Sequence, residues 1–549
     1  MTSRSPRSSL WTPSAPRIGS LLWIASLGLI ALLPTLLLWP FRHAGFVADD
    51  HFFVTTSPTP SSLLAVLTSS WGFPQDATSG YRPVVILSYA LTRAFWTDGP
   101  LAYHLTNFLL HGLNAALLAL IVARLTAARI TTPTLARPVL AGPMLAGLIA
   151  GLLFAIHPST HENVIWISGR TYALASFFAL ALVAWTVSAP ASILASTSAS
   201  VPARMPVEAP RTRPAWRQHA VGLFLFACVL GSYEPAVVLP AGVFLARLAM
   251  TDDPRRRWRD AIAFTLPYVG LLAIYLALRW TYIAPAAADL QATTNKGGGL
   301  AMNVAANLWF LVKGLAAVAL FSTPAIMAML GFAALVAAGL AARVSRPLVL
   351  GLLALTIIAF LPFVSLGGST WRFLYLPLTA FLGAVGIGAA RLLADRRLLV
   401  RALAVLLLLF LSGRSARQYQ IRGQEWQHAG EITRSFVEQT VRLAPSPAPG
   451  TELHFLDPPV YYQSAYIFIT MFHDTIRQGY PPNNALDIVE HRQEPADAVI
   501  RQLASRTDGA PALLFAWSPE NERLSLVWRS NAAERGTDAR THESAGGMR

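Results

Sequence analysis

Cysteine and charge are both scarce in this sequence. One cysteine, Cys228, stands among 549 residues, which excludes an intrachain disulfide framework and any metal site built from several cysteines. Charged residues make up 13% of the chain, about half their share in a typical soluble domain. Hydrophobic residues make up 54%. We therefore exclude an ordinary soluble enzyme and expect most of the chain to lie in a lipid bilayer.

Acidic residues are outnumbered by basic ones, 28 to 43, which gives a formal net charge of +15. A strongly basic chain can bind nucleic acid. Here the basic residues cluster in short links between apolar runs, for example at 255–259, where a multi-pass membrane protein carries its orientation signals. We therefore predict no nucleic-acid partner.

Long apolar runs begin at residue 18 and continue to about residue 413. The first, 18–41, reaches the roughly 20 residues that a spanning helix needs, and it follows an arginine-rich tail, 1–17, that we expect to stay in the cytoplasm. Twelve runs are present, but the basic links favour eleven crossings. The run at 301–321 contains Lys313, a costly residue at mid-bilayer, so we interpret it as interfacial or re-entrant. The chain is then a multi-pass protein of the inner (plasma) membrane whose C-terminus is extracytoplasmic.

Beyond residue 412 the sequence changes to mixed charge with short apolar stretches. Alternation of apolar and polar residues predicts strands at 452–456 and 511–517, with 521–528 as a hairpin partner, and a helix at 496–505.

The predicted fold class is therefore an all-α polytopic membrane domain followed by a small α/β domain. The membrane domain covers 18–412 and includes an external loop at 42–100. The α/β domain covers 413–530 and lies outside the cytoplasm, and the polar tail at 531–549 is predicted to be disordered.

Two adjacent acids, Asp49 and Asp50, follow the first apolar run directly. Neighbouring carboxylates at an apolar boundary repel each other and lose solvation, so we expect one pKa to rise toward the range of a general base. A solvated loop or a helix cap is the alternative, and charge alone favours it.

Polar residues also begin the second run. His104, Asn107 and His111 are spaced i, i+3, i+7 and so share one helical stripe, which could line a cavity or form a structural hydrogen-bond ladder. The external loop before them contains Tyr81 and Arg82. His104 and His111 are about two turns apart, too far to share one metal ion.

Three further groups lie at predicted external ends. His157, Glu162 and Arg170 suit an anionic headgroup, with Arg170 offering a bidentate fork to phosphate, and Pro158 argues against a helical metal site there. Glu234 and Arg372 are isolated charges at apolar edges, and they could bind a ligand or pair with each other.

Six of these segments, taken in order, resemble a known family. They look like the membrane half of the transmembrane O-mannosyltransferases that carry tetratricopeptide repeats, which are relatives of the protein O-mannosyltransferases of the GT-C superfamily. The resemblance covers roughly residues 40 to 395. The motifs are Phe46-Val47-x-Asp49-Asp50, Tyr81-Arg82-Pro83, Tyr103-His104-Leu105-x-Asn107-x-Leu109-Leu110-His111, His157-Pro158-x-x-x-Glu162, Gly169-Arg170 and Leu374-Tyr375-Leu376-Pro377.

The resemblance implies a membrane glycosyltransferase of the GT-C fold with about eleven spanning helices. Such an enzyme moves a sugar, with mannose as the candidate, from a polyprenyl-phosphate donor to a hydroxyl acceptor on a protein or glycolipid at the extracytoplasmic face, with inversion. It also implies roles for particular residues. Asp49 with Asp50 supplies the base, Arg170 and Arg372 hold the lipid phosphate, and the pocket is lined by His104, His157 and Glu162.

Three positions depart from the family pattern: Tyr172, Tyr233 and Trp371 stand where the family commonly has charged residues. The repeat domain is replaced by the α/β module, so the resemblance leaves the sugar and the acceptor open.

The chemistry itself needs one base and several cations but no acid, because phosphate leaves as an anion. No organic cofactor is predicted, no metal ligands are assigned, and a divalent-cation requirement stays open. Two other classes remain as alternatives: a flippase or transporter for lipid or lipid-linked sugar, and a non-catalytic scaffold for envelope assembly.

Overall fold

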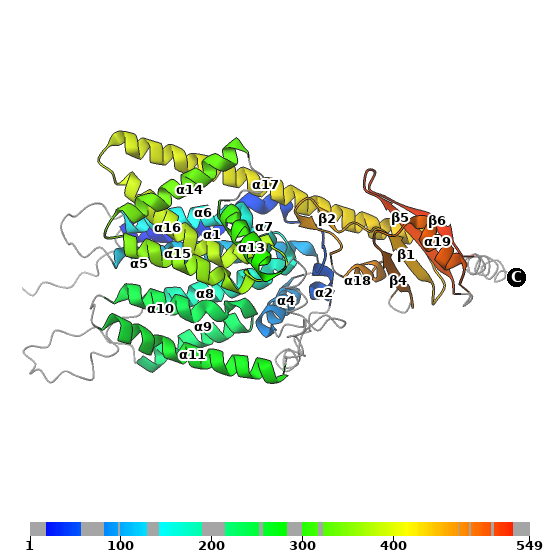
Figure 1. Cartoon of the computed structure of the whole chain (residues 1–549), viewed down its shortest axis with the longest axis horizontal. Helices are drawn as coiled ribbons and strands as arrows, with labels where there is room; N and C mark the ends of the chain where they lie inside the picture. Colours follow the sequence, from blue (N-terminus) through cyan, green and yellow to red (C-terminus); the bar gives the residue numbers. More distant parts are fainter. Residues whose placement is uncertain are drawn as a thin grey trace, which may run out of the picture.

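The computed structural model of the chain consists of a helical bundle and a small sheet domain, joined by one long helix (Figure 1). The structure describes residues 18–55, 82–96, 99–128, 142–188, 215–251, 256–282, 299–316, 322–469, 471–481, 485–506 and 510–530. Tyr81 and the tail at 531–549 lie outside these ranges.

The bundle is built from apolar helices. Within the described ranges, eight are long and apolar enough to cross a membrane, and a ninth candidate is α6 with the segment after it, which is bent by 55°. The shorter helices α9 and α10 also belong to the bundle. The helices named so far are α1 (Ile18–Leu38), α5 (Pro100–Ala127), α6 (Pro143–Ala155), α8 (Arg170–Ser188), α9 (Ala215–Leu230), α10 (Leu239–Met250), α11 (Arg257–Tyr282), α14 (Thr323–Ala341), α15 (Arg346–Phe360), α16 (Tyr375–Leu393) and α17 (Leu398–Leu443).

Two further apolar helices are shorter, α4 (Pro83–Phe95) and α13 (Leu300–Leu315). Helix α13 has 16 residues, as many as α9, so its length alone does not distinguish it from the other short helices of the bundle. The predicted multi-pass, all-α membrane domain is confirmed. The number of crossings and the interfacial place of α13 stay predictions.

Glycines allow the central helices to pack closely. A Cβ on Gly147 of α6 would lie 2.2 Å from the carbonyl oxygen of Ala119 in α5, and one on Gly388 of α16 would lie 1.7 Å from that of Leu335 in α14. Without a side chain at these points the backbones approach directly, as is usual in membrane helix packing. The outer helices instead expose large apolar side chains, such as Leu406 at 62%.

Helix α17 connects the two parts of the molecule. Its 46 residues span roughly 70 Å at 1.5 Å per residue, more than twice the hydrocarbon core of a bilayer. It begins with exposed leucines and continues with a buried stripe that includes Tyr419, Trp426 and Phe436. The boundary predicted at residues 412 and 413 falls inside this helix.

The sheet domain has four strands in the order β4-β1-β5-β6. The strands β1 (Glu452–Leu456), β4 (Asp487–His491) and β5 (Ala512–Ser518) are parallel, and β6 (Arg523–Arg529) pairs antiparallel with β5. Helix α19 (Ala496–Ala504) packs on one face, and α17 with α18 (Phe472–Arg477) covers the other. The small C-terminal α/β domain is therefore confirmed, and β4 is the strand that the sequence did not indicate.

A second, two-stranded sheet lies between this domain and the bundle. It consists of β2 (Tyr461–Tyr462) and β3 (Ala465–Tyr466). In Figure 1 it lies alongside α17, close to the end of the bundle that holds α7 (His161–Val164). Short helix α2 (Asp50–Thr55) lies at the same end.

Candidate functional site

The acid pair lies where α2 begins, and its two members are held differently. Asp50 is 1% exposed and accepts hydrogen bonds from Ser168, at 2.8 Å from the backbone N–H and 2.5 Å from Oγ. The N–H of Val47 adds a third bond at 3.1 Å. Burial raises the pKa of Asp50 to about 7, although these hydrogen bonds oppose the rise. Asp49 is half-buried beside it.

Arg170 is fully buried, and its guanidinium donates hydrogen bonds to groups of the protein itself. Its Nε donates to Asn107 Oδ1 at 2.8 Å, and its terminal nitrogens donate to Thr92 Oγ1 at 2.9 Å and to the carbonyl oxygen of Tyr103 at 3.1 Å. The ring of Tyr89 lies against the guanidinium, with its centre 4.5 Å from Cζ. These contacts favour a structural role for Arg170, which ties three helices together.

The stripe on α5 forms a hydrogen-bond ladder within the protein. His104 Nε2 lies 2.9 Å from the carbonyl oxygen of Ala44, Asn107 Nδ2 donates to the carbonyl oxygen of Ile167 at 3.1 Å, and His111 Nδ1 lies 2.7 Å from the hydroxyl of Tyr375. The ladder ties α5 to Ala44 before the acid pair, to Ile167 next to Ser168, and to Tyr375. Of the two interpretations that the spacing left open, the structure favours the structural one.

Arg372 lies in an aromatic enclosure in η9 (Trp371–Leu374). Its Cζ is 5.4 Å from the centre of the Trp166 ring and 5.9 Å from that of Tyr172. Its backbone N–H donates to Glu162 Oε2 at 3.0 Å. Within the part of the chain that the structure describes, its buried Nε–H has no hydrogen-bond partner. A guanidinium with an unused, buried donor is suited to an anion that is brought in from outside.

Glu234 pairs with Arg82 and not with Arg372. Arg82 Nη2 lies 3.1 Å from Glu234 Oε2, and Arg279 Nη1 lies 3.5 Å from Oε1. Burial of Glu234 is the largest single influence and opposes ionisation, but the charge and hydrogen bonds of Arg82, a backbone hydrogen bond and the charge of Arg279 together lower the pKa of Glu234. The two cations share one carboxylate, which leaves a net positive charge at this end of the bundle.

Two tyrosines connect the two guanidinium groups. The Tyr233 hydroxyl donates to that of Tyr172 at 2.7 Å. The ring of Tyr233 has its centre 5.2 Å from Arg82 Cζ, and Tyr172 faces Arg372. Arg82 and Arg372 therefore flank one pair of hydroxyl groups. Each tyrosine stands where the family commonly has a charged residue, and that departure was the one signal that could have marked them.

The remaining predicted site residues lie deeper. His157 Nε2 is 3.2 Å from the carbonyl oxygen of Leu315, and the Tyr375 hydroxyl accepts from Asn114 Nδ2 at 3.0 Å. Tyr375 also lines the small cavity that touches Arg372. Among the described residues, no three His, Cys, Asp or Glu side chains are grouped so that they could hold a metal ion.

An apolar groove of about 300 Å³ starts next to the small cavity at Arg372. Ala359 and Leu376 line both the groove and a small cavity that touches Arg372, Tyr172 and Tyr233. The groove continues between α5, α8, α10 and α15. The cavity at Arg372 thus borders an apolar groove.

The sequence alone did not indicate two residues that complete the site. Ser168 holds Asp50, and Tyr466 of the C-terminal module has its ring centre 5.8 Å from Arg372 Cζ. Ser168 stands directly before the Gly169-Arg170 motif, which was a usable signal. Nothing in the local sequence around Tyr466 indicates a contact with the membrane domain.

No protein-family model matches the chain. The human protein O-mannosyl-transferase TMTC3 is 29% identical over 160 residues, which are 28% of this chain and 16% of that protein. The Drosophila melanogaster protein O-mannosyl-transferase Tmtc1 is 32% identical over 135 residues, 23% of this chain and 14% of that protein. The matched segment thus spans about a sixth of the length of these relatives.

Among solved structures, the crystal structure of ArnT from Cupriavidus metallidurans bound to undecaprenyl phosphate aligns with 91% of this chain and 93% of that chain, at 10% identity and a TM-score of 0.47. Its apo state aligns over the same shares with a TM-score of 0.42. The resemblance found in the motifs is confirmed by the sequence relatives: over about a quarter of its length, this chain is similar to protein O-mannosyl-transferases.

Proposed function

We propose that this protein is an inverting glycosyltransferase that moves a sugar, with mannose as the first candidate, from a polyprenyl-phosphate donor to an acceptor hydroxyl. One observation supports this most strongly. An acid pair and two guanidinium groups lie at one end of a membrane bundle, and an apolar groove runs from the guanidinium groups between the helices. The reaction needs a base, cations for the leaving phosphate and a surface for the lipid chain. The names of the sequence relatives suggest the sugar.

Asp49 acts as the base. It removes the proton of the acceptor hydroxyl while the hydroxyl oxygen attacks the anomeric carbon, and the bond from that carbon to the phosphate oxygen breaks. The electron pair of that bond leaves with the phosphate, so no general acid is required. Attack opposite the leaving group inverts the configuration. Asp50 keeps the loop in place, since its oxygens are occupied by Ser168 and Val47.

Arg372 and Arg82 hold the phosphate. Arg372 brings a buried Nε–H with no partner in the described chain, and Arg82 is 32% exposed beside the tyrosine pair. Positive groups placed where charge develops on the leaving oxygen lower the barrier. The polyprenyl chain runs from there along the groove between α8 and α15.

The site faces the extracytoplasmic side of the inner (plasma) membrane. The proposal rests on the basic links, which put the N-terminus in the cytoplasm and the loop after α1 outside. The acceptor is then a hydroxyl on a protein or a glycolipid of the envelope. The sheet domain lies on the same side as Asp49, because its hairpin contacts that loop.

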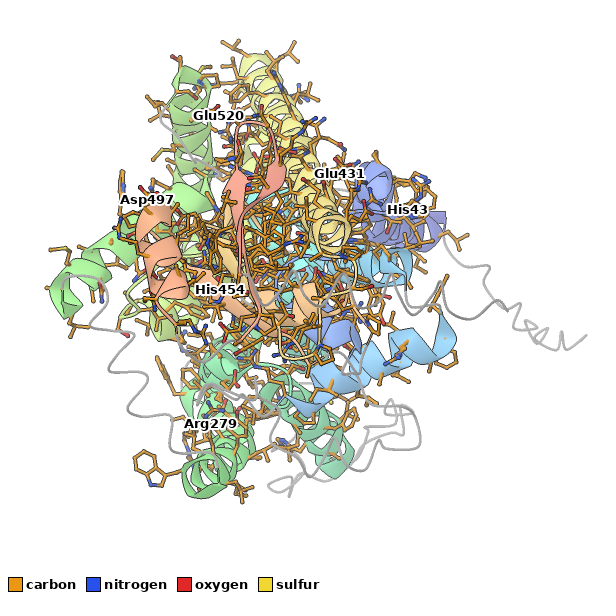
Figure 2. All side chains as sticks on the ribbon, turned by 90° about the vertical axis from the view of Figure 1, so that its right-hand side faces the viewer. His43, Arg279, Glu431, His454, Asp497 and Glu520 are labelled. Carbon is orange, nitrogen blue, oxygen red and sulfur yellow. The ribbon has the colours of Figure 1, made fainter. Side chains whose placement is uncertain are left out.

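The test is mannose transfer by the purified full-length protein, from polyprenyl-phosphate mannose to extracted envelope proteins and glycolipids. Asp49→Asn should lower the rate by about 100-fold or more. Asp497→Asn, an exposed acid on α19 at the outer side of the sheet domain, is the matched control (Figure 2). Full activity of Asp49→Asn would rule out the proposed base. Movement of the lipid across the membrane with no new glycosidic bond would favour a flippase.

A further inference from the structure

The C-terminal module, which comprises the described residues from 413 to 530, directly contacts the loop after α1 that carries Asp49 and Asp50. This loop is called the acid loop below. The backbone N–H of Ala48 donates to the carbonyl oxygen of Ile467 at 2.9 Å. Ala48 has a φ of 46°, in the left-handed region that non-glycine residues rarely adopt, and it directly precedes Asp49. Such a conformation persists only where surrounding contacts impose it. The residue after β3 therefore helps to hold the turn that presents Asp49.

The same hairpin completes the enclosure of Arg372. Tyr466 is 4% exposed, its ring meets that of Trp166 edge to face at 5.0 Å, and its hydroxyl hydrogen-bonds to the carboxylate of Glu162. Glu162 in turn accepts the backbone N–H of Arg372. Tyr466 of the C-terminal module thus contacts both the carboxylate of Glu162 and the ring of Trp166. Both of these groups border the guanidinium of Arg372.

Helix α17 makes a second contact with the acid loop, and here the two backbones meet directly. A Cβ on Gly430 would lie 2.6 Å from the backbone nitrogen of Gly45, four residues before Asp49. Nearby, His51 Nδ1 lies 2.8 Å from Gln478 Oε1 at the end of α18. Figure 2 shows His43 of the loop next to Glu431 of α17, and both line one cavity of about 410 Å³. The acid loop is therefore fixed from both ends by elements beyond residue 413.

We infer that the C-terminal module is an integral part of the catalytic site, with Gly430 and Tyr466 as positioning residues. Gly430 lets the loop approach α17 and so places Asp49. Tyr466 holds Glu162 and Trp166 and so shapes the site of Arg372. The inference rests on the proposed function and adds a role for the module beyond presenting an acceptor.

We expect substitutions of Gly430 and of Tyr466 to change different kinetic constants. A displaced base slows the chemical step and leaves donor binding unchanged, whereas a loosened Arg372 weakens donor binding. A displacement of about 1 Å at a reacting group can cost about 100-fold in rate. Loss of one hydrogen bond to a charged group corresponds to about tenfold in affinity.

The first experiment compares Gly430→Ala with Gly413→Ala in the full-length protein. Both changes add a methyl group to α17, but the Cβ at Gly413 meets no atom within 4 Å. We expect Gly430→Ala to lower kcat for mannose transfer by about 100-fold with an unchanged donor KM, and Gly413→Ala to match the wild type. Equal kcat values for the two variants would overturn this half of the inference.

The second experiment needs no turnover and keeps the fold. Tyr466→Phe removes one hydroxyl, and Tyr461→Phe removes the hydroxyl of an exposed tyrosine on the same hairpin. Binding of a short-chain polyprenyl phosphate, measured by thermal shift, should weaken about tenfold in Tyr466→Phe and stay unchanged in Tyr461→Phe. Equal affinities would overturn the role of Tyr466. Full activity of Asp49→Asn would instead overturn the proposed function and leave these two comparisons interpretable.

Discussion

Asp50 accepts two hydrogen bonds from Ser168, 118 positions later in the chain. This pair attaches the acid loop to the segment that leads into Arg170, and through Asn107 to α5. Two adjacent carboxylates therefore have different surroundings. Asp50 is buried and fixed by Ser168 and Val47, whereas Asp49 is half-buried and is the base in the proposed reaction.

The pH dependence of transfer should report the ionisation of Asp50. Burial raises its pKa from 3.8 to about 7, so folding favours the neutral form, and stability falls as the pH rises between these values because the unfolded chain loses this proton first. The carboxylate accepts stronger hydrogen bonds from Ser168 and Val47 than the neutral acid, so we expect kcat/KM to rise with pH through about 7. In Asp50→Asn the step near pH 7 should disappear. If the rise of kcat/KM near pH 7 persists in Asp50→Asn, it reports the ionisation of another group and the prediction is wrong.

Arg372 should control donor affinity. Replacement by Ala removes the only buried unpartnered guanidinium donor that we find near the tyrosine pair in the described chain, so donor KM should rise by about 10- to 100-fold. Arg372→Lys keeps the charge but not the planar fork and should recover only part of this loss. An unchanged KM and kcat in Arg372→Ala would remove it from the phosphate site.

Arg170 should behave as a structural residue. Arg170→Lys cannot satisfy Asn107, Thr92 and Tyr103 together, and it leaves buried acceptors without a donor. We expect a loss of stability of about 3 kcal/mol, measured by thermal denaturation in detergent, with little change in donor KM of the folded fraction. A large rise in donor KM without loss of stability would assign Arg170 to the phosphate.

Arg82 and Glu234 should be energetically coupled. Either Arg82→Gln or Glu234→Gln leaves a partly buried charge with a reduced set of partners, whereas the double variant removes both charges. A double-mutant cycle on thermal stability should therefore show coupling of about 0.5–3 kcal/mol. Strict additivity would show that the 3.1 Å contact contributes nothing. Arg279, which also contacts Glu234, moderates the effect of Arg82→Gln.

Two glycines test the packing of the bundle. In Gly388→Ala the new Cβ would lie 1.7 Å from the carbonyl oxygen of Leu335, so α14 and α16 must separate, and we expect a loss of at least about 2 kcal/mol. In Gly351→Ala on α15 the Cβ meets no atom within 4 Å, and stability should change by less than about 0.5 kcal/mol. The comparison is made by heat inactivation in detergent. Equal inactivation temperatures would contradict the close contact.

Local patterns in the sequence predicted much of this architecture. The strands near Glu452 and Ala512, the hairpin partner near Arg523 and the helix near Ala496 are all present, because alternation and turn residues act within a few positions. Strand β4 was not indicated because it lies in a short segment of mixed polarity. The acid pair and Arg372 were indicated because charges are rare in an apolar chain.

By itself the sequence determined that this is a multi-pass membrane protein with a small α/β domain, since apolar runs of that length are stable only in lipid and strand patterns are local. The tertiary structure alone decided which charged groups meet one another and which protein groups surround them. Asp50 and Arg170 are occupied by protein groups, Glu234 takes Arg82 as its partner, and Tyr466 reaches Arg372 from the far module. These contacts join residues 63 to 152 positions apart, and at such separations no local pattern records which side chains meet.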